Sequence, residues 1–401
     1  MNLTLLLVVF GVIVAGVWLK RPLYQSMAAA TVAGIVLYGV PFSALGGILL
    51  RGLTGPATVN MVLSFYTITF LQRMLQRRDR LTQAEAALSR LVGNRRINLM
   101  LTPFVIGMMP SVGAVLIAAP IVDRLAGQEL GRDERMFVSS YYRHISEAFL
   151  PTYTTILLAL QLSGQRALPF LAAMLPMVLV LFYLGHLFYV RKVSRGEHGP
   201  ATRAARRAAA AALLRSLWSI LLSVVLILVV PLPIYLIVVG IILFNVWVDR
   251  FTWQELRPMF RSAFESKLII NTFVIMIFKE LLTYAGVLDQ LPQLFAGLPI
   301  PADLLLALTM LFGTMVAGTQ AMVAVMIPLA FATPGSGLAL LTLLMCMSYI
   351  AAQVTPTHIC LSVVAEYYES TLAVLVKKTL PVVGSFLVIA VGYYYVLQAL
   401  L

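Results

Sequence analysis

The sequence predicts an all-α polytopic membrane protein with about ten transmembrane helices and two re-entrant hairpins in an inverted-topology repeat. Three observations predict this fold class: the composition, the placement of basic residues, and a repeated set of landmarks. Of the 401 residues, 61% are hydrophobic and 11% are charged. A soluble domain of this length cannot bury so much apolar surface. Apolar segments of about 20 residues, each sufficient to cross a bilayer, recur along the chain.

Ten apolar segments are predicted as spans. They are residues 1–19, 24–48, 54–73, 136–163, 168–190, 216–231, 233–249, 267–286, 338–363 and 379–401. The first lacks the basic start and the cleavage site of a signal peptide, so we interpret it as a span. Two further stretches, 97–125 and 302–332, are each either a span or a hairpin that enters and leaves on one side.

The basic residues decide between these alternatives. A net charge of +13 is better explained by basic cytoplasmic loops than by nucleic acid binding. Lys20 and Arg21 place the first loop inside and the N-terminus outside, and the next inside loop holds seven arginines in residues 73–96. If 97–125 crossed the membrane, seven basic residues in 191–215 would lie outside. We therefore predict a hairpin there and, with weaker support, at 302–332, which also leaves the C-terminus outside.

Four landmarks recur at nearly one spacing. The pairs are Gly107 and Gly313 (206 apart), Pro120 and Pro328 (208), Pro151 and Pro356 (205), and Asn60 and Asn271 (211). Each half then has three spans, a hairpin, a broken span and a closing span. Because five crossings is an odd number, the second half is predicted to be inverted. Inverted repeats with paired broken helices are typical of secondary transporters.

The breaks are predicted to build one central polar site. Irregular backbone at membrane depth is tolerated only where it lines a cavity or is buried in protein, and a broken helix exposes N–H groups on one half and carbonyls on the other. The alternative is a set of structural kinks whose threonines bond their own helix. The candidates are Pro110, Ser111 and Gly113 at the first hairpin tip; Pro151, Thr152, Thr154 and Thr155 at the first break; Gly318, Thr319 and Gln320 at the second tip; and Thr355, Pro356, Thr357 and His358 at the second break.

Titratable side chains flank both breaks. His144 and Glu147 lie one helical turn apart before the first break, and an intramembrane carboxylate is a functional candidate by default. Glu147 and His358 are candidates for proton coupling, with His144 beside them. The alternatives are an ion pair of Glu147 with His144 or Arg143 that only positions the helix, and a histidine at 358 that is merely hydrogen-bonded.

No cofactor is expected. The chain has no metal-binding Cys/His spacing and no nucleotide-binding motif, and Cys346 and Cys360 are interpreted as small buried hydrophobes. The only metal considered is a coupling sodium ion at the helix breaks. No hydrolase or metalloprotease motif is present, so we do not expect an enzyme.

Three stretches carry a resemblance to a known family: "MPSVGAVLIAAPIVDRL", "YYRHISEAFLPTYTTILLA" and "SYIAAQVTPTHICLSVVAEYY". They resemble the DUF401 group of the ion transporter superfamily, whose relatives include gluconate permeases, citrate carriers, divalent-anion symporters and TRAP transporter membrane subunits. The resemblance implies an elevator-type carrier, usually a homodimer, with a scaffold and a moving transport domain. The Ser-Asn-Thr hairpin signatures of the divalent-anion symporters are absent.

The resulting domain prediction divides each repeat. It comprises residues 1–96 (scaffold) and 97–192 (transport) of the first repeat, a basic cytoplasmic linker at 193–215, and residues 216–300 (scaffold) and 301–401 (transport) of the second repeat. The alanine-rich end of the linker is either part of a solvated segment or a helix that lies on anionic headgroups. The predicted function is ion-coupled transport of a small carboxylate-like anion across the inner (plasma) membrane, driven by protons or sodium. The alternatives are a channel, or a carrier for a cationic or neutral solute. The expected partners are the solute, the bilayer and a second copy, with no nucleic acid.

Overall fold

The chain folds into helices throughout the part described by the computed structural model, which comprises residues 3–19, 21–108, 114–196, 202–287, 301–333, 336–355 and 358–401; this part contains no strand. The first half holds α1 (Leu3–Trp18), α2 (Leu23–Leu37), α3 (Phe42–Thr54), α4 (Pro56–Arg77), α5 (Arg80–Leu91), α6 (Arg95–Gly107), α7 (Ala114–Ala126), α8 (Arg132–Ile145), η1 (Ser146–Ala148), α9 (Thr154–Ser163), α10 (Ala167–Phe188) and η2 (Val190–Lys192). The second half holds α11 (Arg203–Val229), α12 (Ile234–Val248), α13 (Trp253–Ser262), α14 (Ser266–Tyr284), α16 (Ala302–Ala317), α17 (Thr319–Phe331), α18 (Leu338–Ala352), α19 (Ile359–Tyr367) and α20 (Leu372–Leu400).

Four helical stretches in the described residues are long and apolar enough to cross a bilayer: Phe42–Arg77, Ala167–Phe188, Arg203–Val229 and Leu372–Leu400. They contain most or all of the spans predicted at 54–73, 168–190, 216–231 and 379–401. Shorter apolar helices include α2, α9, α12, α16, α17 and α18. The chain is therefore an all-helical membrane protein, and the total of ten crossings stays a prediction.

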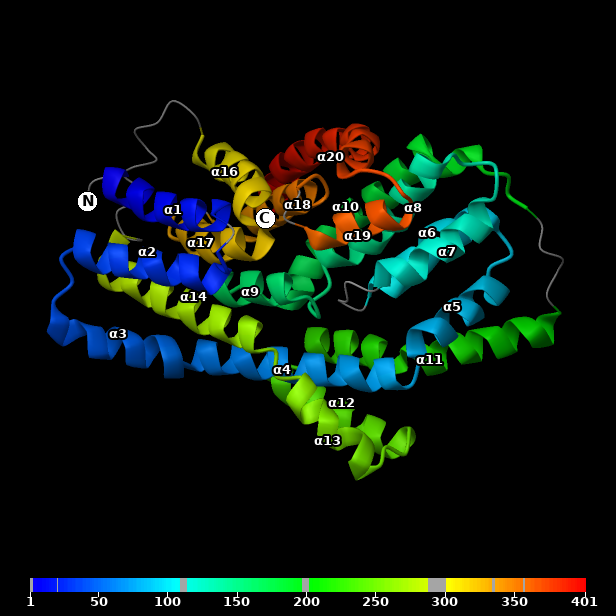
Figure 1. Cartoon of the computed structure of the whole chain (residues 1–401), viewed down its shortest axis with the longest axis horizontal. Helices are drawn as coiled ribbons and strands as arrows, with labels where there is room; N and C mark the ends of the chain where they lie inside the picture. Colours follow the sequence, from blue (N-terminus) through cyan, green and yellow to red (C-terminus); the bar gives the residue numbers. More distant parts are fainter. Residues whose placement is uncertain are drawn as a thin grey trace.

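The segment predicted as one span at 24–48 is two helices. α2 ends at Leu37, Gly39 has a φ of +63°, and α3 begins after Pro41. A left-handed glycine ends a helix readily, and a proline two residues later cannot continue it. In Figure 1, α3 instead runs nearly in line with α4 along one long edge of the molecule.

The predicted linker at 193–215 is also largely helical. From Arg203 onward it belongs to α11, which continues without interruption to Val229. The side chain of Thr202 accepts a hydrogen bond from the backbone N–H of Ala205 and caps the helix, and the alanine run that follows has the highest helix propensity of any residue type. The basic end of α11 packs against α5.

Helices end at both predicted hairpins and at both predicted breaks. α6 packs on α7, and α16 packs on α17 across a single residue, Gly318, whose φ of +83° favours glycine. α8 ends at Ile145, and α9 starts at Thr154. α18 ends at Ala352, and α19 starts at Ile359. α17 contacts α9, and α18 contacts η1, so the two halves meet at their breaks.

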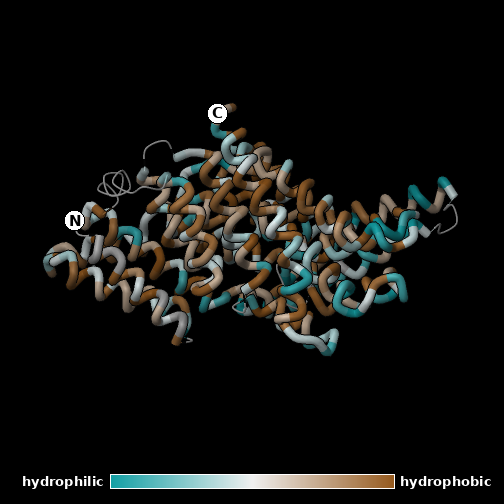
Figure 2. The backbone as a smooth tube through the Cα atoms, turned by 90° about the horizontal axis from the view of Figure 1, so that it is seen from above, coloured by the Kyte–Doolittle hydropathy of each residue, from teal (hydrophilic) through white to brown (hydrophobic). Residues whose placement is uncertain are grey.

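The interior is built around helices that are buried on every side. All residues from Met136 to Ile145 of α8, from Ala321 to Ala330 of α17 and from Ala339 to Ala352 of α18 are buried. A helix that is apolar all round belongs in a core, which fits α17 and α18. α8 is different because it buries an arginine and a histidine. Figure 2 shows hydrophilic backbone gathered at the right-hand end, where α5 and the basic end of α11 lie in Figure 1.

Candidate functional site

A cavity of about 460 Å³ lies where the two helix breaks meet the tip of the second hairpin. This volume lies within the usual range of small-molecule sites. Its lining residues are Glu147, Ala148, Tyr153, Thr154, Thr155, Gly318, Thr319, Gln320, Met345, Ser348, Tyr349, Ala352, Thr355, His358, Ile359 and Cys360. The walls are thus mostly apolar or hydroxyl-bearing, with one carboxylate and one imidazole.

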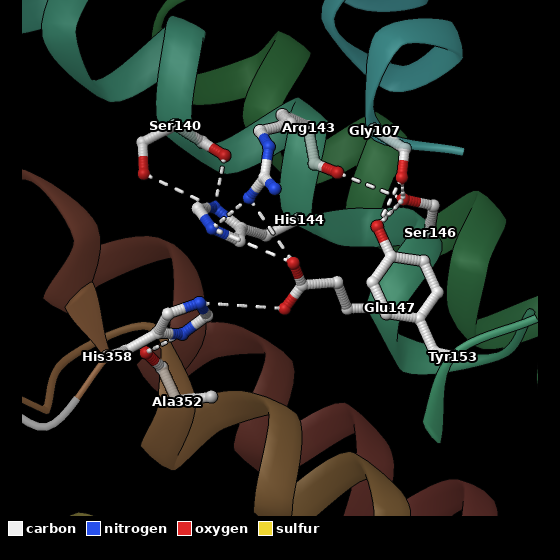
Figure 3. Close-up of polar contacts among 9 residues, drawn as sticks. All are labelled: Gly107, Ser140, Arg143, His144, Ser146, Glu147, Tyr153, Ala352 and His358. Atoms are coloured by element: carbon white, nitrogen blue, oxygen red, sulfur yellow. Dashed lines mark hydrogen bonds and ion pairs between the residues drawn. The ribbon is translucent and has the colours of Figure 1, made fainter. Parts of the chain in front are cut away.

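Glu147 lies at the centre of a charged network that joins the two halves (Figure 3). Its Oε1 lies 3.2 Å from Arg143 Nη1 and 3.9 Å from His144 Nε2. Its Oε2 lies 3.7 Å from His358 Nε2, across the junction with the second half. The Arg143 side chain is only 1% exposed, whereas that of Glu147 is 20% exposed. A deeply buried guanidinium needs such a partner, because an unpaired buried charge is strongly unfavourable.

The hydrogen bonds of His144 fix its tautomer. Arg143 Nη1 lies 2.7 Å from His144 Nε2, and because a guanidinium can only donate, Nε2 accepts. Nδ1 then carries the hydrogen and donates to the Ser140 carbonyl at 2.6 Å. In this arrangement His144 is a neutral residue with both ring nitrogens engaged.

His358 contacts the end of α18 through one ring nitrogen and Glu147 through the other. Its Nδ1 lies 3.2 Å from the Ala352 carbonyl, so Nδ1 is the donor. Its Nε2 therefore faces Glu147 and is the ring nitrogen that can exchange a proton with the carboxylate. The two imidazole rings meet edge to face, with their centroids 4.7 Å apart.

Three helix N-termini point their first turns at this cavity. α9 begins after Tyr153, α17 after Gly318 and α19 after His358, and none of these three residues caps its helix with a side-chain hydrogen bond. The first residues of all three helices line the cavity. Uncapped N–H groups and the positive end of the helix dipole favour a bound anion.

Several buried polar atoms of the cavity wall have no hydrogen-bond partner among the described residues. They are Ser348 Oγ, Tyr349 OH and Gln320 Nε2. Ser348 is 0% exposed and Tyr349 is 4% exposed. Buried polar groups are nearly always paired in proteins, so these atoms are donors and acceptors available to a bound solute.

Each break is tied to the hairpin of its own half by a hydroxyl-to-carbonyl bond. In the first half, Ser146 Oγ donates to the Gly107 carbonyl at 2.7 Å, and the Tyr153 hydroxyl donates to the same oxygen. In the second half, Thr355 Oγ1 donates to the Met315 carbonyl at 2.6 Å. Hairpin and break therefore form one connected unit in each half.

The structure brings together many of the predicted residues. Glu147, Thr154, Thr155, Gly318, Thr319, Gln320, Thr355 and His358 line the cavity. His144 lies behind Glu147, fully buried. Pro110, Ser111, Gly113, Pro356 and Thr357 lie outside the described residues. Thr152 instead faces a separate small space beside α4 and α11, and the neighbouring Pro151 is buried but does not line the cavity.

Several residues at or near the site were not predicted as part of it. Ser348 and Tyr349 lie inside α18, where no break marks them, so the sequence offered no signal. Arg143 was weighed only as an ion-pair partner, although a buried arginine is as unusual as a buried glutamate. Cys360 was interpreted as a small hydrophobe, and it is indeed buried, but it lines the cavity.

A metal is the one cofactor for which ligands come together. One side-chain atom each of His144, His358 and Cys360 lies within 4.8 Å of the others. However, Arg143 already donates to the Nε2 lone pair of His144 that a metal would need. The arrangement therefore favours a hydrogen-bonded network over metal coordination.

Comparison with known proteins places the chain in a family. The family model described as DUF401, a protein of unknown function, matches residues 2–397. The chain belongs to the DUF401 family. No curated protein matches it.

Among solved structures, the fold is similar to that of the YdaH transporter from Alcanivorax borkumensis, described as having an unusual topology. The TM-score is 0.62 at 13% identity, covering 89% of this chain and 87% of that chain. At this identity the likeness shows a shared fold. The DUF401 chain is thus a helical membrane protein with the fold of a transporter.

Proposed function

We propose that this chain is a secondary active transporter of a small carboxylate-like organic anion, working by elevator-type alternating access. The observation that carries the proposal is the convergence of three uncapped helix N-termini on one 460 Å³ cavity. The unpartnered Ser348 and Tyr349 hydroxyls supply further donors for carboxylate oxygens. The fold shared with a transporter supports the same class.

In this proposal the hairpins and broken helices move as one body. The hydroxyl-to-carbonyl bonds of Ser146 and Thr355 join each break to its hairpin, and α17–α9 and α18–η1 contacts join the two halves. Residues 97–192 and 301–401 form this transport domain, and residues 1–96 and 216–300 form the scaffold of a homodimer in the inner membrane, with both termini outside. The two halves are related as inverted repeats.

Glu147 and His358 are the proposed coupling groups. His358 Nε2 faces Glu147 Oε2, and both side chains line the cavity, so a proton or a sodium ion bound there also contacts the solute site. His144 has both ring nitrogens engaged and serves to position Arg143 and Glu147. No catalytic step is proposed.

A second candidate is a carrier or channel for a cationic or neutral solute. One observation favours it: Glu147 carries the only carboxyl group on the described cavity wall, and Arg143 does not line the cavity. A cation would displace Arg143 from Glu147, whereas an anion would bind the N-termini and leave that pair intact.

The deciding experiment measures the melting temperature of the purified protein against a panel of organic acids and amines, with sodium or potassium, at two pH values. A ligand that binds only the folded state raises the melting temperature by mass action. Stabilisation by one acid class supports the anion carrier, and dependence on sodium or on pH names the coupling ion. Stabilisation by amines alone overturns the anion assignment. Saturable counterflow in proteoliposomes then separates a carrier from a channel.

A further inference from the structure

A second hollow, larger than the central cavity, lies between α5 and the basic end of α11. Its volume is about 690 Å³. One wall is a face of α5, from Gln83 to Arg90, and the other is a face of α11, from Ala205 to Ser216. Alanines at 205, 208, 209 and 212 line the α11 wall, and their small side chains leave room between the packed helices. We call this hollow the α5–α11 groove.

The charge of the groove is entirely positive. Arg90, Arg206 and Arg215 line it, and none of its lining residues is acidic. Within the described chain, none of these three arginines has an ion pair or a side-chain hydrogen bond.

Nearby arginines behave differently. Arg78 pairs with Glu255 at 2.7 Å, Arg124 pairs with Glu85 at 3.1 Å, and Arg80 and Arg95 pair with Asp249 and Glu129. These four basic side chains are thus neutralised by carboxylates of the same chain. The three groove arginines, which are exposed, have no such carboxylate partner among the described residues.

The groove lies at the charged N-terminal end of α11. Arg215 is the last charged residue before the apolar run 216–229, which spans about 21 Å at 1.5 Å per residue. α12 packs on α11 and ends at Val248, next to Asp249, which pairs with Arg80 at the start of α5. The start of α5 and the end of α12 are therefore held together, next to the charged end of α11, which is where we expect lipid headgroups if the apolar run crosses a bilayer.

We propose that the α5–α11 groove binds the headgroup of an anionic phospholipid. The phosphodiester accepts charge-assisted hydrogen bonds from the groove arginines within its reach, and the remaining arginine along α11 adds to the positive potential that attracts the anionic headgroup. The alanine walls with Leu91 and Val92 receive the glycerol backbone and the first methylenes of the acyl chains. A soluble phosphate would share the arginines but gain nothing from these apolar walls. Basic pockets at the membrane surface bind such lipids by this combination of charge and apolar contact.

The test compares lipid binding by the full-length protein in detergent. Native mass spectrometry and melting temperature are measured with phosphatidylglycerol and with phosphatidylcholine. The groove variant is Arg206→Gln/Arg215→Gln. The matched control is Arg203→Gln/Arg207→Gln, which removes the same charge from exposed positions of the same helix that do not line the groove.

The wild type and the control are expected to prefer phosphatidylglycerol, and the groove variant to lose about fivefold in apparent affinity for each arginine removed. Arg90→Gln, on the opposite wall, is expected to lose about fivefold alone, which keeps the test valid if the double variant fails to fold. Equal losses in groove and control variants, or no lipid preference in the wild type, overturn the proposal. Equal stabilisation by glycerol phosphate in solution overturns the lipid assignment in favour of a soluble phosphate site.

Discussion

The two helix breaks occupy corresponding places in the two halves, yet they differ in charge. The first break follows Arg143 and His144, which belong to the buried last ten residues of α8, and Glu147 in the η1 turn. The second is entered from α18, whose residues 338–352 include no charged residue, and it contributes Thr355 and His358. Both are tied to their hairpins by a hydroxyl-to-carbonyl bond.

This difference separates the role of the backbone from that of the side chains. The shared element order gives both halves a helix N-terminus at the cavity, which suits anion binding without any charged residue. Most of the ionisable side chains around the breaks, in contrast, belong to the first half. His358, at 3.7 Å from Glu147, extends this network into the second half. We therefore expect substitutions at the first break to destabilise the protein more than matched substitutions at the second break.

The largest effect is expected from Arg143→Met. Removing the buried guanidinium leaves Glu147 without its nearest cationic partner, and breaking a buried pair costs about 3–5 kcal/mol. Thermal unfolding in detergent measures the loss. The double variant Arg143→Met/Glu147→Gln is expected to recover part of this stability, because a neutral amide then replaces the carboxylate that lost its partner. Equal stability of Arg143→Met and the wild type would show that the pair contributes nothing to the fold.

The next largest effect is expected at Gly107, compared with its repeat partner Gly313. A Cβ at Gly107 would lie 2.0 Å from the backbone oxygen of Arg143, which cannot move without displacing α8. A Cβ at Gly313 would lie 2.3 Å from the Met322 Cε, the end of a flexible side chain. Gly107→Ala is expected to destabilise by about 1–3 kcal/mol, as overpacking does, and Gly313→Ala by less. A larger loss at Gly313 would contradict this ranking of the two halves.

A smaller effect is expected at the second break. Thr355→Val keeps the shape of the side chain and removes the bond to the Met315 carbonyl. The expected loss is about 1 kcal/mol, typical of one hydrogen bond. Chemical or thermal unfolding measures it, with Thr309→Val as the control, because Thr309 bonds only within its own exposed helix turn. A loss as large as that of Arg143→Met would remove the contrast between the breaks.

The smallest effect is expected from a charge pair outside the membrane. The hydrogen bond from Arg78 to Glu255 lowers the pKa of that carboxyl from 4.5 to about 2. A lowered pKa adds stability that is complete above pH about 4.5 and is lost as the pH falls towards 2. The melting temperature of the wild type should therefore exceed that of Glu255→Gln at pH 7 and approach it at low pH. If the difference in melting temperature stayed constant across this pH range, Glu255 would stabilise the fold through packing and not through its charge.

The sequence correctly predicted those helix ends that are caused by local signals in the chain. Gly318 ends α16 because its positive φ suits glycine, and the segments flanking Pro151 and Pro356 end their helices where proline and threonine interrupt the pattern. The prediction was wrong where a local signal competes with a longer pattern. The 24–48 segment is apolar throughout, but Gly39 and Pro41 divide it. For the alanine-rich end of the basic linker the sequence left a helix and a solvated segment open, and residues 203–215 form the first part of α11.

By itself the sequence determined the helical membrane class, the paired interruptions and the candidate residues around them, because composition and backbone chemistry act over a few residues. The tertiary structure alone decided that Ser348 and Tyr349 face the cavity and that Thr152 does not. It also decided that Glu147 lies between Arg143 and His358, which are 215 positions apart. Such placements depend on how α8, α17 and α18 pack against one another, and no local pattern encodes the direction in which a buried side chain points.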